Sequence, residues 1–512
     1  MKSSSMNPHA GASAGMGGAN RARPSAPRRS PRFMVALAAA KATQTALRIA
    51  KRKGGQLPGV VAEAVCPDFL ARSSKPGRSI FVTGTNGKTT TTNLIDDLLV
   101  DNGFDPIVNR AGSNIANGVE SALIEDARLT GSLRRGLASI ELDELSCRTV
   151  LPYLTPDLML VTNLYQDNFL RDATPEFIFD VISRYVPAQT HLVLNADDLI
   201  SCRLAPQATR RTYYSLGEAG IEFARAEGGA GDDMPCCPKC GGRMRYRGHT
   251  LLHLGRATCE SCGFTNPPAD YEVTCIDQEA GTMTVRENRP DGTATDGNGV
   301  SAAAPEHAYR ITAFGIPNLY NLLAAIATLR EFGIPAEDLA RSLNGRVGIS
   351  AIRYTEERVG GKELVTCSAK TYNGTGATAS LRAIQARQGR KALILVLNDF
   401  LSKDPMKTEF CGWYYLIDGA PLADDAVRQI IVFGYPEQEE NSREMELRLR
   451  LAGVPADRIA FAHSTREAGD AVDLGEVDSV YALFDCYNGA IARESIARVR
   501  ERLSGRVEGE GR

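Results

Sequence analysis

Short apolar runs alternate with helix-compatible segments along most of the chain. The run at 79–83 (SIFVT) is followed by a glycine-rich turn and by the amphipathic segment NLIDDLLV at 93–100. Further apolar runs occupy 157–161, 391–397, 428–434 and 479–484. Strands that are buried on both faces have such continuous apolar runs, so the alternation predicts an α/β fold with parallel sheets.

Helical segments follow several of these strands. The segment NLLAAIATLREFG at 321–333 ends in glycine with Pro335 beyond, which is a typical helix end. Segments 445–453 and 492–503 are also helical in pattern. From about residue 336, strands and helices alternate again, which predicts a second, smaller Rossmann-like domain over 336–505, before a short tail at 506–512.

The N-terminal region has a different composition. Residues 1–32 are rich in Gly, Ala, Ser, Pro and Arg without apolar periodicity, which predicts a disordered basic arm. Residues 33–53 fit a basic amphipathic helix, within a helix and linker over 33–76, that packs on the body or lies against anionic lipid. Arg28-Arg29 before an apolar stretch resembles an export signal, but the lysines and arginines that follow interrupt that pattern too soon.

Charge and composition narrow the class of protein. Of 512 residues, 43% are hydrophobic and 23% charged, and no run approaches the length of a membrane span. Residues 1–53 carry eleven Lys/Arg and no acid, so the rest of the chain has a formal charge of −13. A globally basic nucleic-acid-binding surface is therefore not expected, and the low cysteine density predicts a cytoplasmic protein.

The turn after the first strand, Gly84–Thr89 (GTNGKT), has the composition of a phosphate-binding loop. Gly84 and Gly87 allow backbone N–H groups to point at phosphate oxygens, Lys88 adds a positive charge, and the Thr89 hydroxyl is a ligand for Mg²⁺. The alternative is a glycine-rich surface turn, which the strand–loop–helix context disfavours. Val82 occupies the position of the first glycine of the usual GxxxxGKT pattern.

Four more segments appear in a fixed order: ASIELDELSC (138–147), VTNLYQDN (161–168), LVLNADD (192–198) and FGIPNLYNLLAA (314–325). With GTNGKTT, they resemble the Mur ligase family. Glu141 and Glu144 flank the end of an apolar strand, a suitable place for an acid that holds Mg²⁺, and the alignment favours Glu141.

The resemblance implies a central ATP-binding domain over 77–335 and the use of ATP and Mg²⁺. It also implies that Asn318 meets the adenine and that Arg353 reaches the nucleotide from the last domain. The expected nucleotide- and Mg²⁺-binding residues are Gly84, Thr85, Asn86, Gly87, Lys88, Thr89, Thr90, Glu141, Glu144, Asn163, Asn318 and Arg353.

Two CxxC pairs lie inside the central domain. Cys237 and Cys240 are separated by an 18-residue spacer from Cys259 and Cys262, the spacing of a zinc ribbon with a closed, structural site. The spacer can form a hairpin, and the insertion spans about 234–266. Cys236, directly before Cys237, leaves the register of the first pair open.

The C-terminal third completes the resemblance. The segments LVTCSAKTYNGTG (364–376), VLNDFLSKDP (396–405) and FDCYNGAI (484–491), together with the inserted cysteines, resemble the MurT family, the ligase subunits of lipid II isoglutaminyl synthase, over about 36–505. That resemblance implies a catalytic aspartate without a certain counterpart here. Asp404 ranks first, before Glu409 and Asp418, and Lys370 is a further catalytic candidate.

The implied reaction is amidation. ATP would phosphorylate the α-carboxylate of D-glutamate in lipid II, and ammonia would then displace phosphate to give D-isoglutamine. The chain has no GxCxG elbow for a glutaminase nucleophile, so ammonia is expected from a separate subunit, which in this family is GatD. Lipid II is membrane-anchored, which would place the protein at the inner face of the membrane.

Two other functions remain open. A Mur-type or folylpolyglutamate-type ligase would add an amino acid, but residues 1–76 leave no room for a UDP-binding domain before the loop. An ATPase that binds nucleic acid through the ribbon would be expected to have a basic body, whereas this body is acidic.

Overall fold

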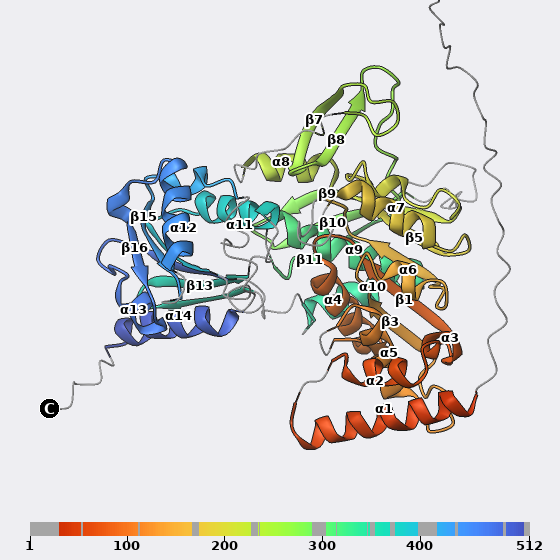
Figure 1. The fold of residues 1–512 in the computed structure, drawn as a ribbon. Coiled ribbons are helices and arrows are strands. Elements are labelled where there is room, and N and C mark those ends of the chain that lie inside the picture. Colours follow the sequence, from red (N-terminus) through yellow and green to blue (C-terminus); the bar gives the residue numbers. More distant parts are fainter. Residues whose placement is uncertain are drawn as a thin grey trace, which may run out of the picture.

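The computed structural model describes residues 30–52, 55–110, 113–165, 174–226, 234, 236–288, 304–313, 315–345, 347–348, 354–368, 374–397, 417–435, 439–484 and 488–505. Two sheets with helices on both faces make up most of this part of the chain, and a small two-stranded hairpin is inserted between two strands of the larger sheet (Figure 1). The α/β class predicted from the apolar runs is therefore confirmed.

The larger sheet has nine strands in the order β11-β10-β9-β6-β5-β4-β1-β3-β2. In chain order they are β1 (Arg78–Thr83), β2 (Ile107–Val108), β3 (Leu137–Glu141), β4 (Leu158–Val161), β5 (His191–Asn195), β6 (Arg211–Ser215), β9 (Tyr271–Asp277), β10 (Thr282–Glu287) and β11 (Glu306–Arg310). Strands β1 to β6 and β9 pair in parallel, and β10 runs antiparallel to both of its neighbours, β9 and β11.

Helices cover both faces of this sheet because successive side chains of a strand point to opposite sides. Ile80 and Val82 of β1 face one apolar core, and Phe81 between them faces another. The first core is closed by α4 (Lys88–Asp101), α8 (Gly217–Ala226), α9 (Ile316–Phe332) and α10 (Ala336–Asn344). The second is closed by α5 (Ala116–Asp126), α6 (Cys147–Val150) and α7 (Pro175–Tyr185).

Strand β1 lies between β3 and β4, at the point where the chain switches from one side of the sheet to the other. Val82 is in register with Glu141, and Thr83 with Val161, so the carboxyl ends of three parallel strands meet there. Open α/β sheets bind ligands at such a switch point, and this edge carries the loop 84–89.

The smaller sheet has the order β12-β13-β17-β14-β15-β16, with only β12 antiparallel. Its strands are β12 (Tyr354–Val359), β13 (Lys362–Ser368), β14 (Lys391–Val396), β15 (Val427–Phe433), β16 (Ile459–Ala462) and β17 (Ser479–Phe484). Its helices are α11 (Gly374–Ala386), α12 (Glu439–Leu451), α13 (Thr465–Asp470) and α14 (Gly489–Leu503). Short 3₁₀ turns occupy Ser201–Arg203, Ala420–Ala423 and Ala456–Arg458.

The N-terminal helix α1 (Pro31–Ile49) packs with α2 (Leu57–Val65), α3 (Phe69–Arg72) and α5 at one end of the molecule (Figure 1). Ser30 caps α1 by accepting a hydrogen bond from the Phe33 N–H, and the Phe33 and Phe69 rings stack with centroids 4.9 Å apart. The sequence predicts this helix over 33–53. In the structure, one face of α1 packs on the rest of the protein. Residues 1–29 of the arm predicted over 1–32 lie outside the described residues, whereas Pro31 and Arg32, assigned to that arm, form the first turn of α1 because Ser30 caps the helix there.

A search of the described residues finds no helix with the length and apolarity that crossing a membrane requires.

A buried carboxyl lies where α2 meets α5. Glu120 is 4% exposed, and Asn117 donates hydrogen bonds to both Glu120 (3.4 Å) and Glu63 (2.7 Å). Burial, with the nearby Glu63 carboxylate, raises the pKa of Glu120 to about 8. The folded protein therefore holds a proton at neutral pH that the unfolded chain releases.

This protonation makes stability depend on pH. The pKa of Glu120 rises from 4.5 to about 8 on folding, so the free energy of unfolding falls as pH increases through that window. The variant Glu120→Gln cannot ionise, so its free energy of unfolding should fall less than that of the parent protein between pH 5 and pH 9. The two falls are expected to differ by at least about 1 kcal/mol. Urea unfolding at the two pH values measures the difference. The exposed Glu222→Gln is the control, and an equal pH response of all three proteins would contradict the assignment.

Candidate functional site

The loop between β1 and α4 is held in a tight turn by its two glycines. Gly84 has φ +125° and Gly87 has φ +84°, both in the region that side chains rarely adopt. A Cβ at Gly84 would lie 2.3 Å from Thr162 Oγ1, and one at Gly87 would lie 2.2 Å from Asn321 Oδ1. The loop is therefore packed between the end of β4 and helix α9, and glycine is required at both positions.

Side chains that follow β4 fix the shape of this loop. Asn163 accepts a hydrogen bond from the Asn86 N–H (3.2 Å) and donates one to the Asn86 carbonyl (3.1 Å). The Thr162 hydroxyl also donates to the Asn86 carbonyl (2.6 Å), and the Thr85 N–H donates to the Asn163 carbonyl (2.8 Å). Asn163, predicted from the sequence, thus lies at the loop and orients its backbone.

Lys88 forms a buried ion pair. Its ammonium lies 2.7 Å from Glu144 Oε1, with side-chain exposures of 8% and 2%, and it also donates to the Gly84 carbonyl. Both partners were predicted site residues. Because a buried charge is costly without a partner, Glu144 holds the ammonium at the mouth of the loop.

Glu141 occupies a separate cluster of oxygen atoms. Its Oε1 accepts hydrogen bonds from the Thr89 hydroxyl (3.0 Å) and from Asn114 Nδ2 (2.9 Å). Asn109 accepts from the Glu141 N–H (2.9 Å) and donates to the Glu141 carbonyl (2.8 Å). The structure therefore separates the two predicted acids: Glu144 pairs with the lysine, and Glu141 lies beside the hydroxyl that suits Mg²⁺.

Asn109 and Asn114 were not predicted. They follow β2, a strand of two residues, Ile107–Val108, whose carboxyl end lies at the same edge of the sheet. The rule that placed Glu141 and Asn163 at this edge also applies to them, but such a short strand gives little sequence signal.

Helix α9 closes the loop from the other side. Asn321 Oδ1 accepts a hydrogen bond from the Thr91 hydroxyl (3.2 Å) and lies against Gly87. Asn318 lies one turn earlier, where it is half-buried. Thr90, in the first turn of α4, is also half-buried.

The four cysteines of the CxxC pairs come together. Their sulfur atoms all lie within 4.8 Å of one another, with Cys237 and Cys262 at 3.8 Å and Cys240 and Cys259 at 3.5 Å. They lie at the base of the hairpin β7 (Met244–Leu251) and β8 (Leu254–Cys259), which was predicted for the spacer. Cys236 is exposed and outside the cluster, so the structure settles the register.

Backbone groups around the cluster already point at the sulfur atoms. The N–H groups of Lys239, Gly242 and Ser261 each donate to a cysteine sulfur at 3.4 Å. Such N–H···S contacts accompany thiolates that bind a metal. Four cysteine sulfurs at these distances therefore fit a tetrahedral Zn²⁺ site without an open coordination position.

The hairpin is bonded to the nucleotide-loop region through buried polar groups. The Tyr320 hydroxyl lies 2.6 Å from that of Thr250 in β7 and donates to Asp197 (2.8 Å). Burial raises the pKa of the Asp197 carboxyl, although the charge of Arg256 and the hydrogen bonds of Ser215 and Tyr320 act to lower it.

A second contact reaches the loop itself. His253 lies 3.4 Å from Asp198 and stacks on Tyr165, whose N–H donates to the Thr85 hydroxyl (3.1 Å). Burial opposes ionisation of Asp198, but His253 and the Leu164 N–H keep its pKa below the ordinary value. The hairpin therefore supports the loop from outside.

Only one predicted catalytic residue of the C-terminal third is described. Asp418 pairs with Arg382 (2.8 Å) and accepts from the Ala420 N–H (3.0 Å), and the Arg382 hydrogen bond holds its pKa below the ordinary value. Asp404, Glu409, Lys370 and Arg353 lie outside the described residues.

The packing at Gly87 predicts a specific defect. In Gly87→Ala, the new Cβ would meet Asn321 Oδ1, so ATP affinity is expected to fall by at least about tenfold as the loop shifts. Calorimetric titration with a nonhydrolysable ATP analogue measures the affinity.

Gly103→Ala is the matched control, because Gly103 has φ +82° but nothing lies within 4 Å of its Cβ position. It carries the same backbone strain, about 1 kcal/mol, without the contact. If both variants bind the analogue like the parent protein, the loop does not form the nucleotide site.

Comparisons with known proteins place this geometry in a family. The chain is 30% identical over 431 residues to the MurT subunit of lipid II isoglutaminyl synthase from Staphylococcus aureus (strain COL), covering 83% of this chain and 89% of that protein. It is 27% identical over 438 residues to the MurT subunit from Streptococcus pneumoniae, covering 84% and 90%. No family model matches the chain.

Solved structures show the same fold. A pseudomurein peptide ligase type C from Methanothermus fervidus superposes with a TM-score of 0.57 at 18% identity, covering 86% of this chain and 80% of that one. MurF from Thermotoga maritima, in complex with ADP, gives 0.54 at 14% identity, covering 88% and 85%. From the sequence identity over most of both proteins, the chain belongs to the family of MurT subunits of lipid II isoglutaminyl synthase.

Proposed function

We propose that this chain is the ligase subunit that amidates the α-carboxylate of D-glutamate in lipid II, forming D-isoglutamine during peptidoglycan synthesis. The observation that carries the proposal is the pairing of Lys88 with Glu144 beside Thr89 with Glu141, at the carboxyl edge of the sheet. This arrangement suits a nucleotide triphosphate with Mg²⁺, and the relatives named above supply the substrate.

The loop residues would hold the phosphates of ATP. Backbone N–H groups of Gly87–Thr90 at the start of α4, together with the Lys88 ammonium, provide donors and positive charge. Thr89 and Glu141 present the hard oxygen atoms that Mg²⁺ prefers, and Glu144 is engaged by Lys88. When bound, ATP supplies the phosphoryl group that turns a carboxylate into an acyl phosphate.

The contribution of the chain is electrostatic and positional. As the phosphoryl group moves to the substrate carboxylate, Lys88 and the loop amides would stabilise the negative charge that develops on it. Ammonia then attacks the activated carbonyl and phosphate leaves. The residue that accepts the ammonia proton is proposed among Asp404, Glu409 and Asp418, with Asp404 first, and Lys370 and Arg353 are proposed to approach from the domain over 336–505.

Ammonia is proposed to come from a separate glutaminase subunit of the GatD type. The protein is proposed to act in the cytoplasm at the inner face of the membrane, where the basic residues of 1–53 face anionic lipid.

We also propose that Cys237, Cys240, Cys259 and Cys262 bind one Zn²⁺ with a structural role. The four thiolates leave no open coordination position, and the hairpin above them bonds to Tyr320 through Thr250 and stacks on Tyr165 through His253. Zinc would therefore stabilise the wall of the nucleotide site rather than take part in the reaction.

An amidation assay tests the proposed reaction. The purified chain with lipid II, ATP and NH₄⁺ is expected to convert one carboxyl of the substrate to an amide, seen as a single amide mass change. Lys88→Ala should lower this rate by at least about a hundredfold while leaving zinc content intact, because it removes the charge at the transferred phosphoryl group.

Arg184→Ala, an exposed arginine of α7, is the control and should keep full activity. The same assay with glutamine plus a GatD-type subunit tests the ammonia source. Incorporation of an amino acid instead of ammonia would favour the Mur-type or folylpolyglutamate-type ligase, and full activity of the Lys88→Ala protein would refute the loop assignment.

The metal proposal has a built-in control. Cys259→Ser is expected to lose most of the zinc and to unfold at a lower temperature, whereas Cys236→Ser should keep one zinc per chain, because Cys236 lies outside the sulfur cluster. Elemental analysis and thermal unfolding measure both effects. Equal zinc content in the two variants would argue against the site.

A further inference from the structure

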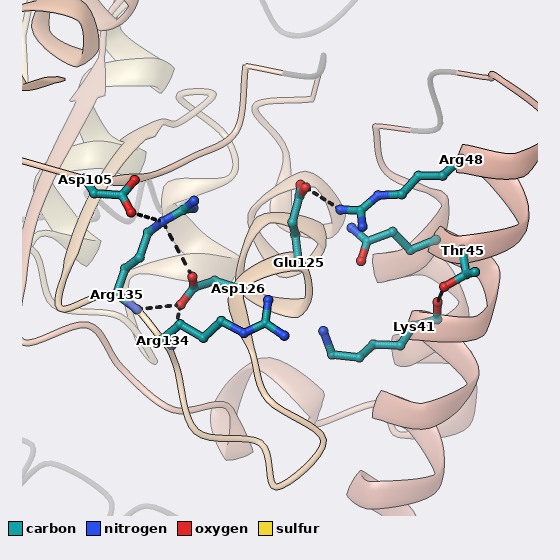
Figure 2. A pocket seen from close by; sticks show the side chains of 9 residues that line it. Lys41, Thr45, Arg48, Asp105, Glu125, Asp126, Arg134 and Arg135 are labelled. Atoms are coloured by element: carbon teal, nitrogen blue, oxygen red, sulfur yellow. Dashed lines mark hydrogen bonds and ion pairs between the residues drawn. The ribbon is translucent and has the colours of Figure 1, made fainter.

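A cavity of about 510 Å³ lies far from the nucleotide loop. It is enclosed by helix α1, the last turn of α5 and the residues that precede β2 and β3 (Figure 2). The nucleotide loop lies at the carboxyl ends of these parallel strands, so this cavity lies at the opposite edge of the sheet. Helix α5, with 11 residues, separates the two regions by roughly 16 Å along its axis.

The walls of the cavity carry more cations than anions. Four basic side chains line it together with three carboxylates. Each carboxylate already has partners within the protein. Arg48 pairs with Glu125 (2.7 Å), and Arg135 pairs with Asp105 (2.8 Å) and approaches Asp126 (3.8 Å).

Asp126 is also bound by the backbone. Its Oδ2 accepts hydrogen bonds from the N–H groups of Arg134 (2.8 Å) and Arg135 (3.0 Å), and the residue is 3% exposed. The Arg134 side chain has no carboxylate partner within the described part of the chain. The ion pairs of these carboxylates in the described part of the chain are thus made with Arg48 and Arg135, and not with Lys41 or Arg134.

Lys41 and Arg134 instead point toward one another across the cavity (Figure 2). The Lys41 ammonium donates to the Ile124 carbonyl at the end of α5 (2.7 Å), which leaves two of its three donors for another group. Burial, with the positive charges of Arg134 and Arg48, lowers the pKa of Lys41, while Asp126 and Glu125 raise it. Two like charges that face each other in a cavity are stabilised by an anion between them.

We propose that this cavity is a binding site for a phosphate ester or diphosphate, held between Lys41 and Arg134. The four cations of the cavity outnumber its three carboxylates, so an anionic group between Lys41 and Arg134 is favoured, and guanidinium groups bind phosphate through paired N–H donors. The volume is within the range of small-molecule sites and larger than one phosphate requires.

Two sources share this chemistry: a phosphate on a lipid, including the diphosphate of a lipid-linked substrate, and a free diphosphate in solution. The inference goes beyond the amidation reaction, since binding in this cavity can be measured without turnover. Failure of the ligase assay and failure of this site are thus separate results.

Site-resolved acylation of lysines tests the proposal. A low dose of acetic anhydride is applied to the full chain, and mass spectrometry gives the rate at each lysine. Bound anion covers the Lys41 amine and favours its protonated form, so inorganic pyrophosphate should slow acylation of Lys41 by roughly tenfold and leave the exposed Lys51 unchanged. Lys88 reports binding at the nucleotide loop separately.

The second probe is a vesicle of phosphatidylglycerol and phosphatidylcholine, compared with phosphatidylcholine alone. Protection of Lys41 by pyrophosphate supports a soluble ligand, and protection by the anionic vesicles alone supports a lipid phosphate. No protection by either probe would overturn the proposal.

Arg134→Gln provides the specificity test. It should reduce the protection of Lys41 by roughly tenfold, because one charge-assisted contact is lost. Arg184→Gln, the same change on α7, should retain full protection. Arg134 is exposed, and matched thermal unfolding of both variants checks their fold. Equal protection in the Arg134→Gln and parent proteins would also overturn the site.

Discussion

The buried ion pair between Lys88 and Glu144 is the interaction on which the proposed nucleotide site depends. Both side chains are almost fully removed from solvent, so neither charge is tolerated without the other. Lys88 begins α4, and Glu144 follows β3, so the pair ties the first turn of a helix to the edge of the neighbouring strand. The ammonium is thereby held at the loop, so the proposed binding of a phosphate there would need little reorganisation.

The surrounding structure stabilises this pair indirectly. Asn163 and Thr162 bind the loop backbone, Asn321 packs against Gly87, and Asn109 and Asn114 orient Glu141. These contacts come from segments that are distant in sequence and converge because parallel strands end at one edge of the sheet. The inserted hairpin adds a further layer through Tyr165 and Tyr320, which connects the cysteine cluster at its base with the loop 84–89.

The two ends of α5 carry different polar groups. Near its start, Asn114 contacts Glu141, and at its end, Glu125 and Asp126 meet the basic residues of α1 and of the segment before β3. The C-terminal end of a helix favours nearby cations, and the Lys41 ammonium donates to the Ile124 carbonyl at that end of α5. A single helix thus connects the nucleotide edge of the sheet with a second charged region at the opposite edge.

The sequence by itself determined the local elements and the chemistry of two motifs. Continuous apolar runs predicted the strands, GTNGKT predicted a tight turn between a strand and a helix, and the spacing of Cys237, Cys240, Cys259 and Cys262 predicted that four sulfur atoms meet, because each depends on residues that are close in the chain. Tertiary structure alone decided that Glu144 pairs with Lys88 while Glu141 joins Thr89, that Asn109, Asn114 and Asn321 support the loop, and that Arg134 faces Lys41. Those contacts join segments up to 230 residues apart, and they are set by strand order and helix packing, which no local pattern encodes.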